Sequence, residues 1–226
     1  MLNLSYAIKK FLFPIIRPLS NWYLERSHSY QWNGIKVAVL PGVFNPALSL
    51  STSFLLSYIK EQNLRGKMFL ELGAGCGLMS VFAAKKGADV MASDISRKSV
   101  VNTLTNMQLN EVEFSVIRSD LFDHIPAYLF DYIAINPPCY PHAPLIESDY
   151  ELYCGENFEF FQKLFSQLPS YLHEDSIVWM ILPTDSDIKQ VRYIAATCSF
   201  QLKEVMVKRS WGEKYIIFEA RLVDYG

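Results

Sequence analysis

The sequence lacks a strong excess of charge of either sign. Its 226 residues include 21 lysines and arginines and 23 aspartates and glutamates, which gives a formal net charge of −2. The surface as a whole therefore has no basic field that could attract a nucleic acid. Any nucleic-acid partner would have to be held by a local basic patch.

Cysteine and histidine are scarce, with four of each. The cysteines form no C-x-x-C pair and have no histidines at the spacing of metal ligands: they are Cys76, Cys139, Cys154 and Cys198. This pattern argues against a zinc site and against a disulfide framework. We expect no metal and a reducing, cytoplasmic setting.

No apolar run is long enough to span a bilayer. The most apolar stretch lies in residues 1–35, where Arg17 and Pro18 interrupt it and no small-residue cleavage site follows. Its apolar side chains share one helical face, and Pro14 should divide the helix into short segments. We predict an amphipathic N-terminal arm that packs on the domain; contact with a membrane surface or with the substrate is the alternative.

The remaining residues, 36–226, show no internal repeat and no change of composition, so one domain is expected. Strands are predicted at 68–72, 89–93, 113–119, 130–136 and 176–182, and helices at 50–62, 78–87, 97–110, 156–172 and 187–198. This alternation indicates an α/β fold, a parallel sheet with helices on both faces. The last two strands, 202–210 and 213–223, are close enough in sequence to form an antiparallel hairpin at the edge.

Three glycines follow the first of the parallel strands, in the stretch Glu71-Leu-Gly-Ala-Gly-Cys-Gly77. A glycine turn between a strand and a helix lets an anionic ligand approach the main chain and meet the helix dipole. The dinucleotide pattern G-x-G-x-x-G fails, because residue 78 is leucine. A nucleotide-like ligand is indicated, although a tight turn without a ligand would also explain the glycines.

Polar residues occupy the ends of the next three strands. Asp94 lies where a carboxylate can accept the two hydroxyls of a ribose, although it could instead cap a helix. Asp120 could accept a hydrogen bond from an adenine amino group. The sequence Asn136-Pro-Pro-Cys-Tyr140 ends the fourth strand. Because ligands bind at the carboxyl ends of such strands, this layout predicts one crevice.

These motifs resemble the class I S-adenosylmethionine-dependent methyltransferases. The N-P-P-C-Y sequence and the upstream 40–59 segment are similar to the small-domain group that methylates planar nitrogens, which includes release-factor glutamine and ribosomal and transfer RNA base methyltransferases. The resemblance implies a Rossmann-like, seven-stranded, mostly parallel sheet. It also implies that S-adenosylmethionine is held by Glu71, Gly73, Ala74, Gly75, Gly77, Asp94, Ile95, Asp120, Leu121 and Asn136.

The same resemblance assigns the acceptor side of the site. Asn136 and the Pro137 carbonyl would accept the N–H hydrogens of the acceptor nitrogen and so stabilise its developing positive charge. An aromatic residue usually follows N-P-P and stacks on the substrate, but here Cys139 occupies that position after Pro138. Tyr140 or Phe44 is predicted to supply the stacking instead.

The methyl acceptor stays open between a protein glutamine, an RNA base and a small molecule. A noncatalytic scaffold that binds S-adenosylmethionine, or a relative of altered specificity, is the alternative function, because the chain keeps N-P-P but lacks the usual aromatic residue. A catalytic Cys139 thiol is disfavoured because no histidine is adjacent to activate it.

Overall fold

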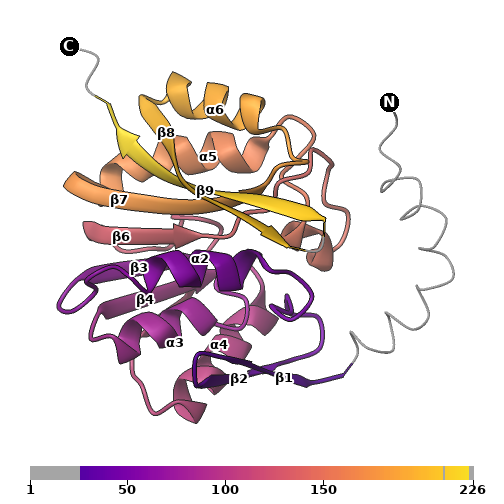
Figure 1. Ribbon diagram of the computed structural model, residues 1–226, viewed down its shortest axis with the longest axis vertical. Coiled ribbons are helices and arrows are strands. Elements are labelled where there is room, and N and C mark those ends of the chain that lie inside the picture. Colours follow the sequence, from indigo (N-terminus) through magenta and orange to yellow (C-terminus); the bar gives the residue numbers. More distant parts are fainter. Residues whose placement is uncertain (1–25, 211, 224–226) are drawn as a thin grey trace, which may run out of the picture.

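A seven-stranded sheet forms the centre of the computed structural model, which describes residues 26–210 and 212–223 (Figure 1). The strands are β3 (Met68–Leu72), β4 (Asp89–Asp94), β5 (Ser115–Arg118), β6 (Phe130–Ile135), β7 (Leu172–Pro183), β8 (Phe200–Ser210) and β9 (Glu213–Leu222). Their order in the sheet is β5-β4-β3-β6-β7-β9-β8. The strands from β5 to β7 are parallel, whereas β9 runs antiparallel to both of its neighbours. The predicted Rossmann-like sheet with its antiparallel edge hairpin is confirmed.

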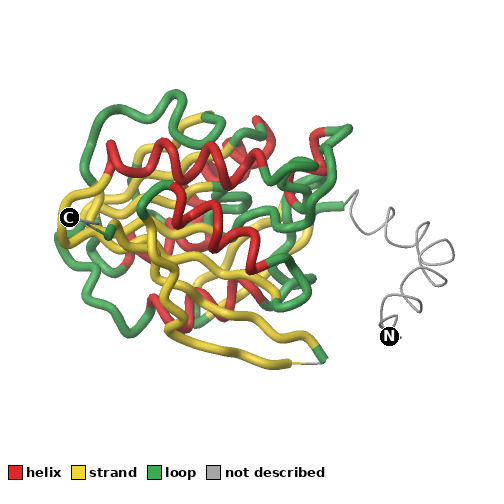
Figure 2. The backbone as a smooth tube through the Cα atoms, turned by 90° about the horizontal axis from the view of Figure 1, so that it is seen from above, coloured by secondary structure: helices red, strands yellow, loops and turns green. Residues whose placement is uncertain are grey.

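Helices cover both faces of the sheet, as Figure 2 shows in red. They are α2 (Ser51–Ile59), α3 (Leu78–Lys85), α4 (Arg97–Leu109), α5 (Glu159–Gln167) and α6 (Ile188–Thr197), with 3₁₀ helices η1 (Glu147–Glu151) and η2 (Leu168–Tyr171). Successive residues of a strand point to opposite faces of the sheet, so the sheet has an apolar core on each face. In β7, Trp179 and Ile181 join the core under α2 and α3, whereas Val178 and Met180 join the core under α5 and α6.

A second, two-stranded sheet precedes the main one and was not predicted. It consists of β1 (His28–Trp32) and β2 (Ile35–Val39). Asn33 and Gly34 both have positive φ, 47° and 83°, as a type I′ hairpin turn requires. The inward face of β2 is buried in the core under α3. The predicted arm ends at residue 35, but this hairpin runs through that position. Residues 1–25 of the predicted arm lie outside the described residues.

Helix α4 holds this hairpin through buried amide side chains. Asn102 Oδ1 accepts the Leu40 N–H at 2.8 Å, and Asn106 Oδ1 accepts the Ala38 N–H at 2.7 Å. Asn106 Nδ2 also donates to the Cys76 carbonyl at 2.8 Å. One residue of α4 thus connects the hairpin to the glycine loop that follows β3.

The predicted helix at 156–172 is wrong in its extent. Phe158 has a left-handed φ of 62°, so α5 begins only at Glu159. Pro169 lacks the N–H that would continue the α-helical bonding, and the chain tightens into η2 before β7 begins at Leu172. No helix in the part of the chain that the structure describes has the length and apolar character needed to cross a bilayer.

Candidate active site

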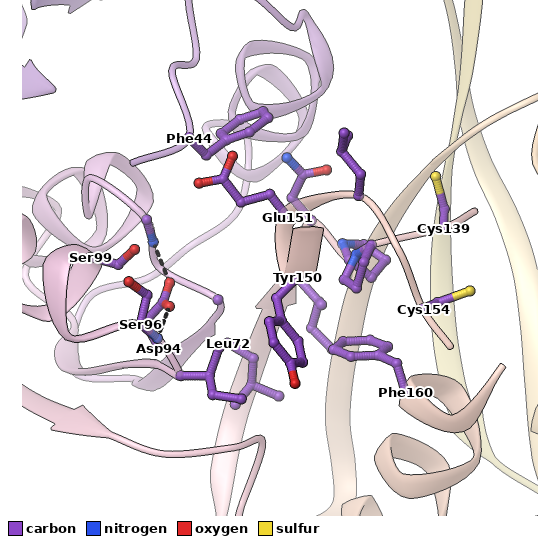
Figure 3. Close-up of a pocket in the computed structure, with 18 of the residues that line it drawn as sticks. Phe44, Leu72, Asp94, Ser96, Ser99, Cys139, Tyr150, Glu151, Cys154 and Phe160 are labelled. Atoms are coloured by element: carbon purple, nitrogen blue, oxygen red, sulfur yellow. Dashed lines mark hydrogen bonds between the residues drawn. The ribbon is translucent and has the colours of Figure 1, made fainter. Parts of the chain in front are cut away.

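A cleft of about 750 Å³ opens at the carboxyl ends of β3, β4 and β6 (Figure 3). The structure brings most of the predicted site residues together in its lining: Phe44, Glu71, Gly73, Ala74, Gly75, Asp94, Ile95, Asp120, Leu121, Asn136, Pro137, Pro138, Cys139 and Tyr140. Gly77 is the exception. It precedes α3 and faces α4, where a Cβ would lie 2.7 Å from Thr103 Cγ2. Its lack of a side chain serves helix packing.

The glycine loop is fixed to β4 by its main chain. The N–H groups of Gly73 and Ala74 both donate to the Ser93 carbonyl at 2.9 Å. Gly73 and Gly75 have φ values of 73° and 56°, in the left-handed region that favours glycine. A Cβ at Gly73 would meet no protein atom within 4 Å. The space beside this glycine is therefore open cleft.

Asp94 joins the glycine loop to the start of α4. Its Oδ2 accepts the Gly75 N–H at 2.9 Å, and its Oδ1 accepts the Ser96 N–H at 2.8 Å (Figure 3). The Asp94 side chain is nearly buried, with 9% of the residue exposed. The carboxylate thus fixes the turn before α4 and lines the cleft, and its predicted contact with ribose hydroxyls stays a prediction.

Glu71 lies in the wall behind the loop and is 2% exposed. Its Oε2 accepts hydrogen bonds from the N–H of Ser80, at 2.7 Å, and from the Ser80 hydroxyl. Burial raises the pKa of Glu71 to about 8. Because the carboxyl group is bonded to the first turn of α3, its predicted pairing with a donor ammonium group stays a prediction.

Asp120 and Leu121 follow β5 and form the far side of the cleft. Leu121 has a φ of 51°. Asp120 Oδ2 lies 2.7 Å from Lys163 Nζ, and the same ammonium group bridges to Asp123 at 2.7 Å. About half of the Asp120 side chain is exposed, so it can still meet a ligand at the mouth of the cleft.

The Asn136 amide is held in a defined orientation at the end of β6. Its Nδ2 donates to Ser51 Oγ at 2.9 Å and to Thr52 Oγ1 at 3.3 Å. Both hydroxyls belong to the first turn of α2. Within residues 26–210 and 212–223, Oδ1 of Asn136 has no hydrogen-bond partner. The oxygen is therefore the end of the amide that can accept a hydrogen bond from a ligand.

The residues after Pro138 are held by the segment around Leu152. The N–H groups of Cys139 and Tyr140 both donate to the Leu152 carbonyl at 3.0 Å, and the Cys154 N–H donates to the Tyr140 carbonyl at 2.9 Å. Cys139 is 6% exposed, and burial raises the pKa of its thiol to about 12. A thiol of this kind stays protonated at neutral pH and is a poor nucleophile.

The Tyr140 ring is half-buried against the core under α5 and α6. Its hydroxyl lies 3.4 Å from both carboxylate oxygens of Asp185. Burial raises the pKa of this phenol. Phe44 also lines the cleft (Figure 3). Stacking by either ring on the acceptor stays a prediction.

Sequence reasoning missed three residues of the cleft. Ser51 and Thr52 fall in the serine-rich start of a predicted helix, but no local pattern connects them to Asn136, 85 residues away. Glu151 lies in η1 and turns its carboxyl group toward Phe44 (Figure 3). Burial, together with the charge of Asp94, raises the pKa of Glu151 to about 7.

Comparison with known proteins identifies the family. The model of the methyltransferase small domain matches residues 34–208. A putative protein N5-glutamine methyltransferase of Methanocaldococcus jannaschii is 30% identical over 194 residues, which cover 79% of this chain and 96% of that protein. The chain belongs to the methyltransferase small domain family. It is an S-adenosylmethionine-dependent methyltransferase.

Two further proteins that this chain resembles are named for different acceptors. A ribosomal protein L11 methyltransferase of Thermotoga neapolitana is 28% identical over 183 residues, 78% of this chain and 60% of that protein. The structure of a T. thermophilus 16S rRNA N2 G1207 methyltransferase with AdoMet and guanosine matches with a TM-score of 0.63 and 20% identity, over 88% of this chain and 50% of that one. The chain thus spans only 50–60% of these two proteins.

The cleft of this small-domain methyltransferase fits its donor. Its volume lies within the range of roughly 300–1,000 Å³ that is typical of ligand pockets. The open space beside Gly73 accepts a ligand against the main chain, and Asp94 offers a carboxylate at its edge. Within residues 26–210 and 212–223, no three histidine, cysteine, aspartate or glutamate side chains are grouped closely enough to hold a metal ion.

Proposed function

We propose that the enzyme transfers a methyl group to a planar nitrogen, either an amide or an exocyclic amine, of a protein or nucleic-acid acceptor. Bound S-adenosylmethionine supplies an electrophilic methyl group on a sulfonium. The nitrogen lone pair forms the new N–C bond as the C–S bond breaks, and the bonding pair stays on sulfur. One N–H proton then leaves the nitrogen. Such a displacement depends mainly on alignment and on exclusion of water.

The observation that carries the proposal is the orientation of Asn136. A planar nitrogen is a weak nucleophile because its lone pair is delocalised, so it benefits from acceptors that take its N–H groups. Ser51 and Thr52 occupy the Asn136 Nδ2, which leaves Oδ1 for such an N–H. The rigid Pro137 residue would offer its carbonyl for the second N–H. These acceptors stabilise positive charge on nitrogen and do not need to remove a proton before the transfer.

The donor would be held by the first three strand ends. Gly73 and Gly75 would admit its methionine part against the main chain, Asp94 would accept the ribose hydroxyls, and Asp120 would meet the adenine amino group. Glu71 would affect donor binding indirectly, by positioning α3, because its carboxyl group accepts hydrogen bonds from Ser80. This division places the donor beside the glycine loop and the acceptor beside Asn136.

Replacement of Asn136 tests the proposal. Asn136→Ala should leave S-adenosylmethionine affinity within about twofold by calorimetry while the rate of methyl transfer falls by roughly 10². Transfer is measured with labelled donor on total cellular protein and RNA, and mass spectrometry of the hydrolysed product identifies the methylated atom. An unchanged rate, or a methyl group on carbon or oxygen, would contradict nitrogen transfer. Asn63→Ala, an exposed asparagine outside the cleft, is the matched control.

A further inference from the structure

Two segments form the outer part of the cleft on the acceptor side. Much of residues 42–49 and 143–156 lines the same cavity as Asn136 and Pro137, namely residues 42–46, 48, 49, 143, 144 and 150–156, and Leu145 and Ile146 lie between these lining residues in the chain. The Glu151 carboxyl group of the second segment lies beside Phe44 of the first (Figure 3). An acceptor whose nitrogen reaches Asn136 therefore lies close to both segments. We call them the acceptor rim.

The lining of the cleft is acidic. Its ionisable carboxyl residues are Glu71, Asp94, Asp120, Glu151, Glu156, Glu159 and Glu213, whereas Lys163 is the only lysine or arginine among the lining residues. Lys163 is already bound by Asp120 and Asp123. Glu71 and Asp94 are buried, but Glu156 and Glu213 are exposed at the outer part. The described lining of the cleft therefore carries a negative charge, and Lys98, which reaches Gly42, lies outside this lining.

The rim also exposes apolar side chains. Leu145 is 86% exposed, Ile146 63% and Leu48 62%, and Tyr150 and Leu152 are about half exposed. Loose structure does not explain this exposure, because the N–H groups of Leu145 and Ile146 both donate to Asp149 Oδ2, at 2.9 and 3.2 Å. Apolar groups that are held in water beside a cleft mark a site of protein interaction.

A nucleic acid would meet the wrong chemistry at this rim. Binding of RNA relies on lysine and arginine that neutralise phosphates, and the rim places carboxylates and leucines there instead. A polypeptide can supply complementary groups of both kinds. We infer that the acceptor is a polypeptide in which lysine or arginine and apolar side chains flank a glutamine or asparagine amide, and that the acceptor rim binds those flanking residues. This inference rests on the nitrogen transfer proposed above.

Defined acceptors test this inference. Synthetic peptides with one central glutamine or asparagine and flanks of lysine and leucine, lysine and serine, or glutamate and leucine are compared with total ribosomal and transfer RNA, with labelled S-adenosylmethionine as donor. The lysine and leucine peptide should have a kcat/KM roughly tenfold or more above the glutamate peptide, with an intermediate value for the lysine and serine peptide. This preference should weaken as salt is added.

Surface variants connect the preference to the rim. Glu156→Lys should raise the KM for the lysine peptides by roughly fivefold, and the double variant Leu145→Ser, Ile146→Ser should raise it for the leucine peptides. Donor affinity should not change. Matched controls at the opposite end of the sheet are Glu174→Lys and Leu129→Ser, both at exposed positions just before or within the start of a strand. These controls should leave both values unchanged.

Three outcomes would overturn the inference: labelling of RNA but of no peptide, labelling of peptides without regard to their flanks, and labelling of no probe by enzyme that still binds the donor. In the first case, Arg209→Ala and Lys214→Ala, at paired positions near the tip of the β8–β9 hairpin, should reduce labelling of RNA. The failures are distinguishable by product. Methyl on a base nitrogen contradicts the polypeptide acceptor and agrees with nitrogen transfer. Methyl on a carbon or oxygen of a peptide contradicts nitrogen transfer, and with it the amide, but agrees with a polypeptide acceptor.

Discussion

The proposed donor half and the proposed acceptor half of the cleft are built in different ways. In the donor half, main-chain groups of the glycine loop bond to Ser93 and Asp94, and the supporting carboxylates are buried. In the acceptor half, the side chains of Ser51 and Thr52 orient Asn136, and the rim is exposed. A ligand that is the same throughout the family can be recognised by main-chain groups in a fixed geometry. An acceptor that differs between relatives is read by side chains, which can change without refolding of the sheet.

The largest expected effect comes from filling the space beside the glycine loop. Gly73→Ala places a Cβ in open cleft, and we expect S-adenosylmethionine affinity to fall by roughly 10² or more, measured by calorimetry. The positive φ also costs about 1–2 kcal/mol of stability. Gly34→Ala is the matched control, since Gly34 has a φ of 83° and nothing within 4 Å of its Cβ. It should destabilise similarly and leave affinity unchanged; equal affinities in the two variants would contradict the donor assignment.

Removal of the Asp94 carboxylate should affect both binding and stability. Asp94→Ala loses the predicted ribose contact, so donor affinity should fall more than about tenfold. It also leaves the N–H groups of Gly75 and Ser96 without their acceptor, which should lower the free energy of unfolding by about 1–3 kcal/mol. Calorimetry and urea denaturation measure the two effects. A loss of stability with unchanged affinity would reduce Asp94 to a structural role.

The acceptor half should respond in rate and not in donor affinity. Ser51→Ala removes the nearer hydroxyl that holds Asn136, and free rotation of the amide should lower the rate of transfer by roughly five- to tenfold. Ser51→Thr keeps a hydroxyl and should recover most of the rate. If Ser51→Ala instead weakens donor binding in proportion to the rate, the two halves are not separable in the way the contacts indicate.

Glu71→Gln should have the smallest effect on donor affinity, within about threefold, because the side chain faces α3. Its effect appears in the pH dependence of stability. The pKa of Glu71 is about 8 in the folded protein, above the ordinary value of 4.5, so the unfolded chain ionises first. The stabilisation that the protonated Glu71 side chain gives the folded protein is complete below pH 4.5 and is lost as the pH rises toward 8. Urea denaturation from pH 5 to pH 8 should show a shallower decline in the free energy of unfolding for Glu71→Gln than for the unmutated protein.

Most of the sheet could be predicted because its strands are buried apolar runs whose ends are clear in the sequence. β3 was placed without error, and β4, β6 and β9 were placed to within one residue, since apolar runs there end at glycine or polar residues. The β1–β2 hairpin was missed although Asn33-Gly34 is a strong turn signal, because its strands are short and were attributed to an arm. A local signal therefore existed and was overlooked.

The grouping of the glycine loop, Asp94 and Asp120 in one cleft could be predicted for the same reason, since these residues follow strands in sequence order. Glu151 could not be predicted, because it lies in a 3₁₀ helix without periodicity and enters the cleft only through tertiary packing. The hydroxyls that orient Asn136 were likewise hidden by sequence distance. A contact between two segments that are distant in sequence produces no recognisable pattern in either segment alone.

The order of strands across the sheet bears on synthesis of the protein. A ribosome releases β3, β4 and β5 first, and these three adjacent strands carry the glycine loop, Asp94 and Asp120. β6 emerges next and pairs with β3 on one side. The strand on its other side, β7, ends only at Pro183. β7 in turn pairs on its other side with β9, which lies near the end of the described chain. The nucleotide end of the cleft is thus translated well before the catalytic end is supported on both sides. A nascent chain therefore contains the residues proposed to hold the donor before it contains the strands that complete the sheet beside Asn136.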